Sequence, residues 1–336
     1  MNVKNIGLLF IILLLEIVIS SCGTGGSGGA VKKRAIKVSH CLQADFSSEL
    51  HTAAWIFQQW VNDHSETLEV RIYASNALGQ ERDVYEGMQL GGGASCALSG
   101  TAILNNFNKK IGVLDLPFLW RDYDHVHRVL DGEIGDVLAD ELAEQGFVVL
   151  AWMDSWGYRN VVTTSKEVVR PEDLKGLKIR TIQTPNYIAA LNAMGSNATP
   201  MAFGEVYTSL QTGVLDGFEH NASIVKGNKF YEVAGHIALT RHLFGPVAFV
   251  FSKAEWDTLT DEEQRIIREG AIMARDIERA LAPVREEEAM DFLKGKGMKI
   301  HEIDTAVFRK NAEKLQEELA RECDAADLLT KIRDAE

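Results

Sequence analysis

Apolar side chains along this chain recur with two different periods, those of strands and those of helices. Residues 35–39 and 68–73 are short segments rich in strand-forming residues, as in half-buried strands. Residues 48–64, between them, place an apolar side chain every three to four positions, which is the spacing of one face of a helix. Strands that alternate with helices predict an α/β fold with largely parallel sheets.

The same reasoning predicts the remaining elements. Expected strands are residues 94–98, 147–152, 158–163, 177–180, 247–251 and 298–303, and expected helices are residues 83–90, 171–174, 185–194, 203–212 and 311–325. The glycines at 91–93 are interpreted as a helix-to-strand turn. A further long helix begins at a capping box formed by Thr260 and Glu263, and Pro283 should kink or break it.

The N-terminal residues have the pattern of an export signal. Lys4 precedes an apolar run that is shorter than the roughly 20 residues needed to span a bilayer. Small residues then precede Cys22 and resemble a lipobox, and a glycine-rich stretch typical of a flexible tether follows. We expect a lipoprotein-type signal peptide at residues 1–21, lipid attachment at Cys22 and a tether at residues 22–34. The protein would then be extracytoplasmic; an uncleaved membrane anchor is the alternative.

Composition and charge limit the classes of ligand. The chain has 48 acidic and 35 basic side chains and a net charge of −13, which argues against nucleic acid as a partner. An anionic ligand would need a local basic pocket within this acidic protein. The residues after the tether are numerous enough for two domains of ordinary size.

The sequence offers no motif for an enzyme or a metal centre. It lacks GxSxG, phosphate-loop and HExxH motifs. His125 and His127 are two positions apart on an expected helix, so they do not share a face. We therefore expect no catalytic residue, no metal and no cofactor.

Three cysteines remain besides Cys22. Cys41, Cys96 and Cys323 are odd in number and lack CxxC spacing, which excludes a disulfide-dense scaffold or a cysteine metal framework. Cys41 and Cys96 lie in short apolar runs. This position favours buried free thiols, and a bridge between the two stays open.

Seven motifs occur in order along the chain. They are LGQERDVYEGMQLG at 78–91, LPFLW at 116–120, GYRN at 157–160, RPEDLKGLKIR at 170–180, TPMAFGEVYTSLQTGVLDGFEH at 199–220, KFYEVA at 229–234 and LTRH at 239–242. Together they resemble the solute-binding proteins of tripartite ATP-independent periplasmic (TRAP) transporters, over nearly the whole mature chain.

The resemblance implies a two-lobed α/β clamp of the periplasmic-binding-protein type. The ligand would lie in the cleft between the lobes, a long kinked helix would bridge them, and the chain would cross between them near Gly157 and Gly245. The implied first lobe is residues 35–156 plus 246–283, and the implied second lobe is residues 157–245 plus 284–336. Such proteins deliver ligand to a membrane permease that an ion gradient drives.

Two arginines match the anion contacts of that family. Arg180 matches the arginine that clamps the ligand carboxylate, and Arg159 matches a second arginine near the same anion. A guanidinium stays charged when buried and presents two parallel donors to a carboxylate. The alternatives are a structural salt bridge for Arg180 and a solvated charge for Arg159.

The residues that follow Asp216 and Gly217 depart from a common family pattern. His220 stands where many members have an asparagine that reaches the ligand, and Asn221 follows it. Imidazole still donates a hydrogen bond, so both are candidate ligand contacts. Asp216 and Glu219 are expected to support the arginines or the fold of the lobe.

Weaker candidates follow the first two strands or could form apolar walls. They are the polar residues His40, Gln43, Gln80 and Glu81, at the edge where open α/β sheets hold ligands, and the aromatic residues Phe118, Trp156 and Phe244. Packing in the core is an equal alternative for each of them.

We therefore expect a monomeric, lipid-anchored protein that is not an enzyme. It would capture a small organic acid anion, in particular a sugar acid such as a uronate or aldonate, for a TRAP permease. Dicarboxylates, 2-oxo acids, sialic acid and small sulfonates stay open as ligands, as does the coupling ion. Two other classes also stay open: a receptor whose loaded clamp docks on a sensor protein, and an extracytoplasmic enzyme on this scaffold.

Overall fold

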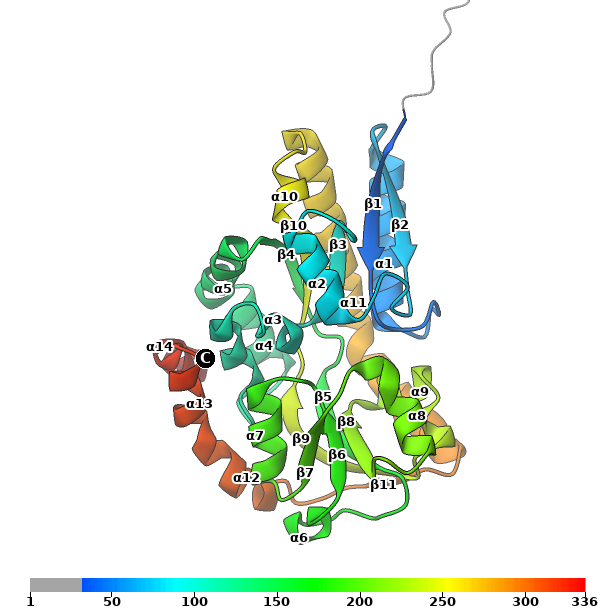
Figure 1. Ribbon diagram of the computed structural model, residues 1–336, viewed down its shortest axis with the longest axis vertical. Helices are drawn as coiled ribbons and strands as arrows, with labels where there is room; N and C mark the ends of the chain where they lie inside the picture. The colour runs from blue at the N-terminus through cyan, green and yellow to red at the C-terminus, as the bar shows by residue number, and fades with distance from the viewer. Residues whose placement is uncertain (1–31, 336) are drawn as a thin grey trace, which may run out of the picture. The chain divides into compact units, whose positions relative to one another are not determined.

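Two mixed β-sheets form the framework of the chain (Figure 1). The computed structural model describes residues 32–335, and Lys33–Glu336 forms one compact unit. The predicted signal peptide, the lipidation site Cys22 and nearly all of the predicted tether lie outside the described residues.

The first sheet has the strand order β2-β1-β3-β10-β4. Its strands are β1 (Arg34–Ser39), β2 (Leu68–Tyr73), β3 (Cys96–Gly100), β4 (Phe147–Met153) and β10 (Val247–Ser252). β1 is parallel to β2 and β3, but β10 runs antiparallel to both β3 and β4. Four of the five strands thus run in one direction, which agrees with the prediction of largely parallel sheets. The exception is β10, which enters this sheet on its return from the second one.

The second sheet has the strand order β11-β9-β5-β8-β6-β7. Its strands are β5 (Tyr158–Thr163), β6 (Lys178–Thr181), β7 (Asn197–Pro200), β8 (Gly217–His220), β9 (His236–Phe244) and β11 (Lys299–His301). β5 is antiparallel to β8 and β9, whereas β6 is parallel to β7 and β8. The strand patterns of β7, β8 and β9 were not recognised in the sequence, and β11 is shorter than predicted.

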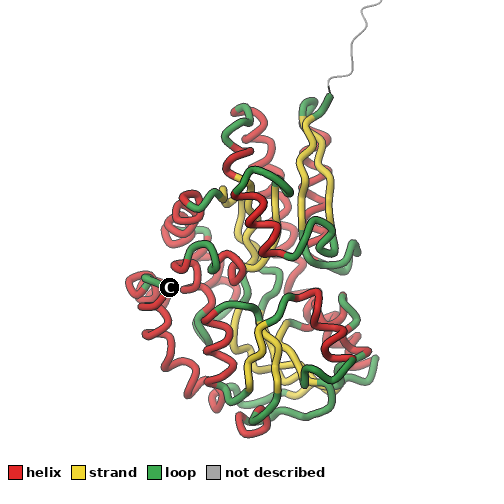
Figure 2. The backbone as a smooth tube through the Cα atoms, in the orientation of Figure 1, coloured by secondary structure: helices red, strands yellow, loops and turns green. Residues whose placement is uncertain are grey.

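Helices pack around both sheets (Figure 2). The longer ones are α1 (Glu49–His64), α2 (Glu81–Gln89), α4 (Tyr123–Leu130), α5 (Glu133–Glu144), α7 (Pro185–Ala193), α11 (Asp261–Gly295) and α14 (Ala326–Asp334). The shorter ones are α3 (Thr101–Leu104), α6 (Pro171–Leu174), α8 (Val206–Gln211), α9 (Ala222–Gly227), α10 (Lys253–Trp256), α12 (Ala306–Ala312) and α13 (Gln316–Glu322). Four 3₁₀ helices complete the described part: η1 (Lys109–Asp115), η2 (Phe203–Glu205), η3 (Phe230–Glu232) and η4 (Glu313–Leu315). The single helix predicted over 311–325 is thus three shorter elements.

The backbone passes from one sheet to the other at two glycines. The strand before Gly157 belongs to the first sheet and the strand after it to the second, and the reverse holds at Gly245. Gly157 has φ +40°, and a Cβ on Gly245 would lie 3.1 Å from the Cβ of Trp156. The chain thus passes between the sheets at the two glycines where crossings between lobes were predicted, and glycine favours both the positive φ at Gly157 and the close approach at Gly245.

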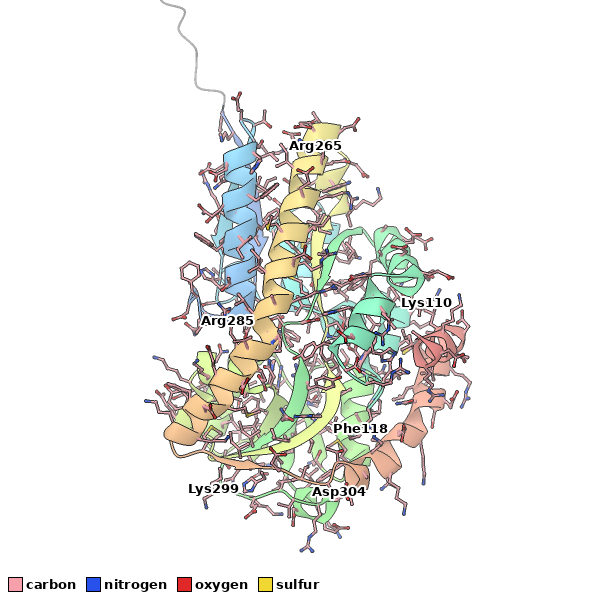
Figure 3. All side chains as sticks on the ribbon, turned by 180° about the vertical axis from the view of Figure 1, so that it is seen from behind. Lys110, Phe118, Arg265, Arg285, Lys299 and Asp304 are labelled. Atoms are coloured by element: carbon pink, nitrogen blue, oxygen red, sulfur yellow. The ribbon has the colours of Figure 1, made fainter. Side chains whose placement is uncertain are left out.

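The long helix α11 is a third connection between the regions of the two sheets. It contacts α1 and β4 in its first part and also packs against α9. The predicted capping box is present, with Glu263 N–H donating to Thr260 Oγ1 and Thr260 N–H donating to Glu263 Oε2. The helix continues through Pro283, so a break there was wrong, and Figure 3 shows its direction changing beyond Arg285.

The C-terminal helices pack against the first half of the chain. Leu319, Leu329 and Ile332 belong to one apolar cluster with Val129 of α4 and Leu138 of α5. The predicted division into two lobes stays a prediction, and these contacts place α13 and α14 beside residues assigned to the first lobe. Cys41, Cys96 and Cys323 are buried free thiols, so no Cys41–Cys96 bridge is present. None of the described helices has both the length and the apolarity of a membrane span.

Two carboxyl groups are buried side by side where β4 ends. Glu278 Oε2 accepts a hydrogen bond from Asp154 N–H at 3.0 Å, and Glu278 Oε1 has no partner within residues 32–335. His127 Nε2 lies 2.8 Å from the Asp154 carboxylate. Burial raises the pKa of Glu278 well above its usual range, Asp154 and Glu49 add to the rise, and Arg279 opposes it.

Substituting Glu278→Gln should make the stability of the protein less sensitive to rising pH. The folded state holds the proton of Glu278 more tightly than the unfolded state does. The wild type therefore loses stability as pH rises from the ordinary value of 4.5 toward the raised pKa. Glutamine keeps an acceptor for Asp154 N–H but cannot ionise.

Urea unfolding at pH 5 and pH 8 measures this difference. The loss of unfolding free energy between the two pH values should be larger in the wild type than in Glu278→Gln, by about 1 kcal/mol or more. The exposed Glu287 on the same helix provides the control, because Glu287→Gln should leave the loss unchanged. An equal loss in the wild type and Glu278→Gln would contradict a buried, protonated Glu278.

Candidate functional site

Arg180 is a buried cation at the carboxyl end of β6. Its side chain is 3 % exposed, and both Nε and Nη2 donate to the backbone oxygen of Met201, at 2.9 and 2.6 Å. No carboxylate among the described residues forms an ion pair with it. Burial lowers the pKa of Arg180 to about 10, Arg159 adds to the lowering, and Glu219 opposes it. The guanidinium therefore stays charged at neutral pH without a counter-ion of its own, and the structural salt bridge is excluded for these residues.

Arg159, in contrast, is fully paired. It lies on β5, next to β8, and its Nε and Nη2 bind the two carboxylate oxygens of Glu219, with 3.0 Å from Nη2 to Oε1. Thr181 Oγ1 donates to the same Oε1 at 3.2 Å, and both charged side chains have no exposed area. Burial alone would lower the pKa of Arg159, but the charge of Glu219 raises it above its ordinary value. A solvated charge at this position is excluded.

The close approach of three strands brings the two arginines together. Gly217 starts β8 between β5 and β6, and a Cβ there would lie only 2.3 Å from the backbone oxygen of Val162. A side chain at this position would push β8 away from β5. The alternation of the strand then directs Glu219 to the same buried layer as its partner Arg159.

His220 is neutral and oriented by Arg159. Arg159 Nη1 lies 3.3 Å from His220 Nε2, and because a guanidinium can only donate, this ring nitrogen accepts. The other ring nitrogen, Nδ1, lies 3.0 Å from Asn221 Oδ1 and 3.0 Å from the Asn221 backbone nitrogen. Burial lowers the pKa of His220 well below its ordinary value, and Arg159 contributes to the lowering.

The side chain of Asn221 forms hydrogen bonds within its own segment of the chain. Its Oδ1 also caps α9 by accepting from Ile224 N–H at 3.3 Å, and its Nδ2 donates to Ser223 Oγ at 3.0 Å. Asp216 similarly accepts a bond from the backbone N–H of Lys178. Both polar residues thus hold the local chain, as the sequence had suggested for Asp216.

Trp156 packs against this group from the first crossing of the chain. Its φ is +102°, and its ring lies 5.6 Å from the Arg159 guanidinium carbon and 5.6 Å from the His220 ring. A Cβ on Gly100 would lie 2.0 Å from the Trp156 ring, so β3 leaves space for it. Trp156 Nε1 is buried and finds no hydrogen-bond partner in the described part of the chain.

The first sheet contributes a polar group opposite Arg180. Glu81 on α2 accepts a hydrogen bond from Ser99 Oγ, and burial raises its pKa, while Ser99, Cys41 and Arg180 oppose the rise. Gln80 reaches toward the second sheet, because a Cβ on Gly204 would lie 2.9 Å from Gln80 Nε2.

His40 is the third polar residue on the side of the first sheet, with Gln80 and Glu81. Its Nε2 lies 3.2 Å from His51 Nδ1, and its Nδ1 is buried without a partner among residues 32–335. Burial lowers the pKa of His40 to about 3, and His51 contributes, so the ring is neutral. Gln43, in contrast, is exposed.

Phe118 and Phe244 lie outside the group around Arg180. The Phe244 ring packs between Tyr123 and Tyr158, at 5.5 and 5.1 Å, within an apolar core cluster. The Phe118 ring lies 5.3 Å from the guanidinium carbon of Arg309. Neither ring is therefore part of the candidate site around Arg180, and the contacts of Phe244 favour the alternative of core packing.

Sequence reasoning missed three residues that support the arginines. The Tyr187 ring lies 5.4 Å from the Arg159 guanidinium carbon, and the Phe203 ring lies 5.8 Å from that of Arg180. His242 Nε2 is 3.9 Å from Glu219 Oε2. The apolar periodicity of the α7 helix signalled burial of Tyr187, but nothing local connects it with an arginine 28 positions earlier.

The arrangement suits anion binding. A buried guanidinium without a counter-ion, two neutral histidines and an aromatic ring converge from both sheets. No three histidine, cysteine or acidic side chains in the described residues are placed to hold a metal ion. His125 and His127 diverge, toward the backbone oxygen of Ile332 and toward Asp154.

Comparison with known proteins agrees with this geometry. The profile of bacterial extracellular solute-binding protein family 7 matches residues 40–322. The 2,3-diketo-L-gulonate-binding periplasmic protein of Escherichia coli is 35% identical over 260 residues, covering 77% of this chain and 79% of that protein.

Two solved structures have the same fold. A TRAP periplasmic solute-binding protein from Bordetella bronchispeptica, with density assigned to pantoate, has a TM-score of 0.86 and 32% identity. One from Chromohalobacter salexigens with bound D-glucuronate has a TM-score of 0.85 and 32% identity. Each comparison covers 90% of this chain and 100% of the other. The chain therefore belongs to family 7 of the bacterial extracellular solute-binding proteins, the periplasmic solute-binding components of TRAP transporters.

Proposed function

We propose that this protein is an extracytoplasmic lipoprotein that captures a hydroxylated monocarboxylate, a sugar acid such as a uronate or aldonate, and delivers it to a TRAP permease. The observation that carries the proposal is the buried guanidinium of Arg180, which lacks a counter-ion among the described residues. The ligand carboxylate would supply that charge.

The donors of Arg180 support a carboxylate as the group that is bound. A guanidinium has five N–H groups, and the two bonds to Met201 leave three of them without a partner in residues 32–335. A carboxylate offers two oxygens in the plane of this fork. Charge and geometry thus favour a carboxylate over a neutral sugar.

The polar side chains beside the first sheet favour a ligand that carries hydroxyl groups in addition to its carboxylate. Glu81 offers carboxyl oxygens, Gln80 an amide and His40 an unpartnered ring nitrogen. A second carboxylate on the ligand would face the acidic Glu81, which disfavours dicarboxylates. The similar proteins from Escherichia coli and Chromohalobacter salexigens are described with 2,3-diketo-L-gulonate and D-glucuronate, which both carry one carboxylate and several hydroxyls.

Closure of two lobes around the ligand is part of the proposal. The two crossings at Gly157 and Gly245 and the helix α11 are the connections that would bend, and the contacting groups come from both sheets. A ligand that binds the closed form more tightly shifts the population toward it. We take the predicted lobes as the moving bodies.

Substituting Arg180→Lys should strongly weaken the binding of D-glucuronate or the sugar acid that binds best in a screen. Lysine keeps the charge but loses the fork of donors. Loss of one partner of a buried charge pair costs about 2–5 kcal/mol, so affinity should fall by roughly 30-fold to several thousand-fold. Calorimetry on folded protein measures this change, with the exposed Arg82→Lys as the control. Binding within about threefold of wild type would exclude Arg180 as the anion clamp.

The two buried arginines should have opposite effects on the stability of the ligand-free protein. Arg180→Met removes a buried cation that lacks a counter-ion, so the free energy of unfolding should rise while binding is lost. Glu219→Gln leaves Arg159 buried without its anion and should lower the free energy of unfolding by about 3–5 kcal/mol. Urea unfolding of both variants tests the assignment, and a loss of stability in Arg180→Met would contradict an uncompensated charge.

The lipoprotein assignment predicts a lipid-modified Cys22 at the mature N-terminus. The apolar run, the small residues before Cys22 and the glycine-rich stretch support it. Mass spectrometry of protein isolated from membranes should find a diacylglyceryl group on Cys22, and Cys22→Ser should release the protein from the membrane fraction. An unmodified N-terminus at another residue would rule the lipid anchor out.

A further inference from the structure

A cavity lies on the side of the molecule that Figure 3 views, where Phe118 is labelled. It has a volume of about 640 Å³. Its walls come from the loop before α4, from β5 and β9, and from the part of α11 that follows Pro283. Arg159, Arg180 and His220 do not line it, so the cavity is separate from the candidate ligand site.

An irregularity of β9 brings Arg241 to this cavity. The pairing of β5 with β9 shifts register between Arg159 and Val161, and Arg241 lies in the left-handed region with φ +45°. Asn160 Oδ1 accepts the Arg241 backbone N–H at 3.2 Å in place of a strand partner. A bulge of this kind re-directs a side chain at some cost in backbone energy, and such distortions concentrate at functional sites.

Two donors at the cavity have no partner in residues 32–335. The Arg241 side chain is exposed, and its guanidinium forms no ion pair or hydrogen bond within this range. The hydroxyl of Tyr158 is buried and likewise unpartnered. A buried hydroxyl without a hydrogen bond is costly. A ligand oxygen between Arg241 and Tyr158 would satisfy both groups.

The acidic side chains of the cavity are largely engaged elsewhere. Glu286 accepts from the backbone N–H groups of Ala222 and Ser223, at 2.8 and 2.9 Å. Asp122 caps α4 by accepting from His125 N–H at 2.7 Å. The negative charge of these two residues is thus directed to backbone donors. Glu302 also lines the cavity, together with the cationic side chains of Arg121, Arg241 and Arg309.

Four of the lining residues are aromatic. Phe118, Trp120, Tyr123 and Tyr158 all line the cavity. Phe118 has φ +56°, so a second strained residue contributes a side chain here, and Arg309 stacks on its ring at 5.3 Å. Flat apolar surfaces beside a cation match a ligand with an aromatic ring and one negative group.

We propose that this cavity is a second ligand site, which binds an aromatic monocarboxylate through Arg241 and Tyr158. The carboxylate binds the guanidinium and the hydroxyl, and the ring packs against the aromatic walls. Tyr158 directly follows the first crossing at Gly157, Arg241 precedes the second at Gly245, and Met290 of α11 is also a wall. Occupancy therefore acts on the connections that would bend during closure.

Calorimetric titration of the intact protein with benzoate tests the proposal, with acetate as the probe that lacks a ring. Benzoate should saturate with a dissociation constant of about 1 mM or lower, and acetate should not. Arg241→Asn should weaken benzoate binding by about 10-fold or more, because a hydrogen-bonded charge is lost. Asparagine is chosen because it tolerates positive φ.

Three variants separate the possible outcomes. Tyr158→Phe should weaken benzoate binding by about 3- to 10-fold, and it serves if Arg241→Asn does not fold. Arg180→Met should leave benzoate binding unchanged, so this result does not depend on the proposed sugar-acid function. Arg82→Asn removes an equivalent exposed charge far from the cavity and should also have no effect.

The proposal is overturned by any of three results. A failure of benzoate to saturate below about 10 mM would show that no aromatic acid site exists. Binding could vanish in Arg180→Met and persist in Arg241→Asn, which would place benzoate in the interlobe cleft. An equal loss in Arg241→Asn and Arg82→Asn would show a general effect of net charge.

A competition experiment measures the coupling between the benzoate site and the sugar-acid site. If benzoate occupied the same site as the sugar acid, the apparent dissociation constant of the sugar acid would rise without limit as benzoate is added. A second site gives a change that reaches a plateau, because coupling between two sites is finite and reciprocal. A plateau supports the proposal, and an unlimited linear rise contradicts it.

Discussion

The buried pair of Arg159 and Glu219 is the interaction on which the candidate site depends. It joins β5 to β8 in the middle of the second sheet, with no exposed area on either side chain. The desolvation of each of these two charges is offset by the partner and by further hydrogen bonds. Thr181 supplies one of these bonds, and His220 and Trp156 take their positions from the same guanidinium.

The charge count around this pair supports the proposal that an anion binds here. Two guanidinium groups and one carboxylate lie together in the second sheet, so the layer carries one positive charge in excess. Burial lowers the pKa of Arg180 to about 10, which is far too high for the group to lose its proton at neutral pH. The protein is acidic as a whole, and the excess positive charge is confined to a small buried region. Binding a carboxylate brings that region to neutrality.

Local sequence patterns were sufficient to predict the elements that are stabilised by residues close to them in the sequence. The capping box at Thr260, the strand β5 and the short helix α6 begin where their residues predict, because caps, alternation and an N1 proline act within a few positions. They were insufficient for β8, whose sequence GFEH contains a glutamate and a histidine in a fully buried strand. The partner that makes these residues tolerable is Arg159, sixty positions earlier. For the same reason Asn221 could be placed in sequence but its use as a helix cap could not.

Three segments of the chain hold the Trp156 ring in place. β3 leaves room for it at Gly100, the second crossing approaches it at Gly245, and its own backbone is held at positive φ. A substitution at any of these positions would disturb Arg159 as well, since the ring packs on that guanidinium. The opposite wall, with Gln80, Glu81 and His40, carries no such constraint on the two arginines. Single substitutions beside the first sheet could therefore change ligand preference during evolution. The arginines of the second sheet, which are proposed to bind the acid group, would stay the same.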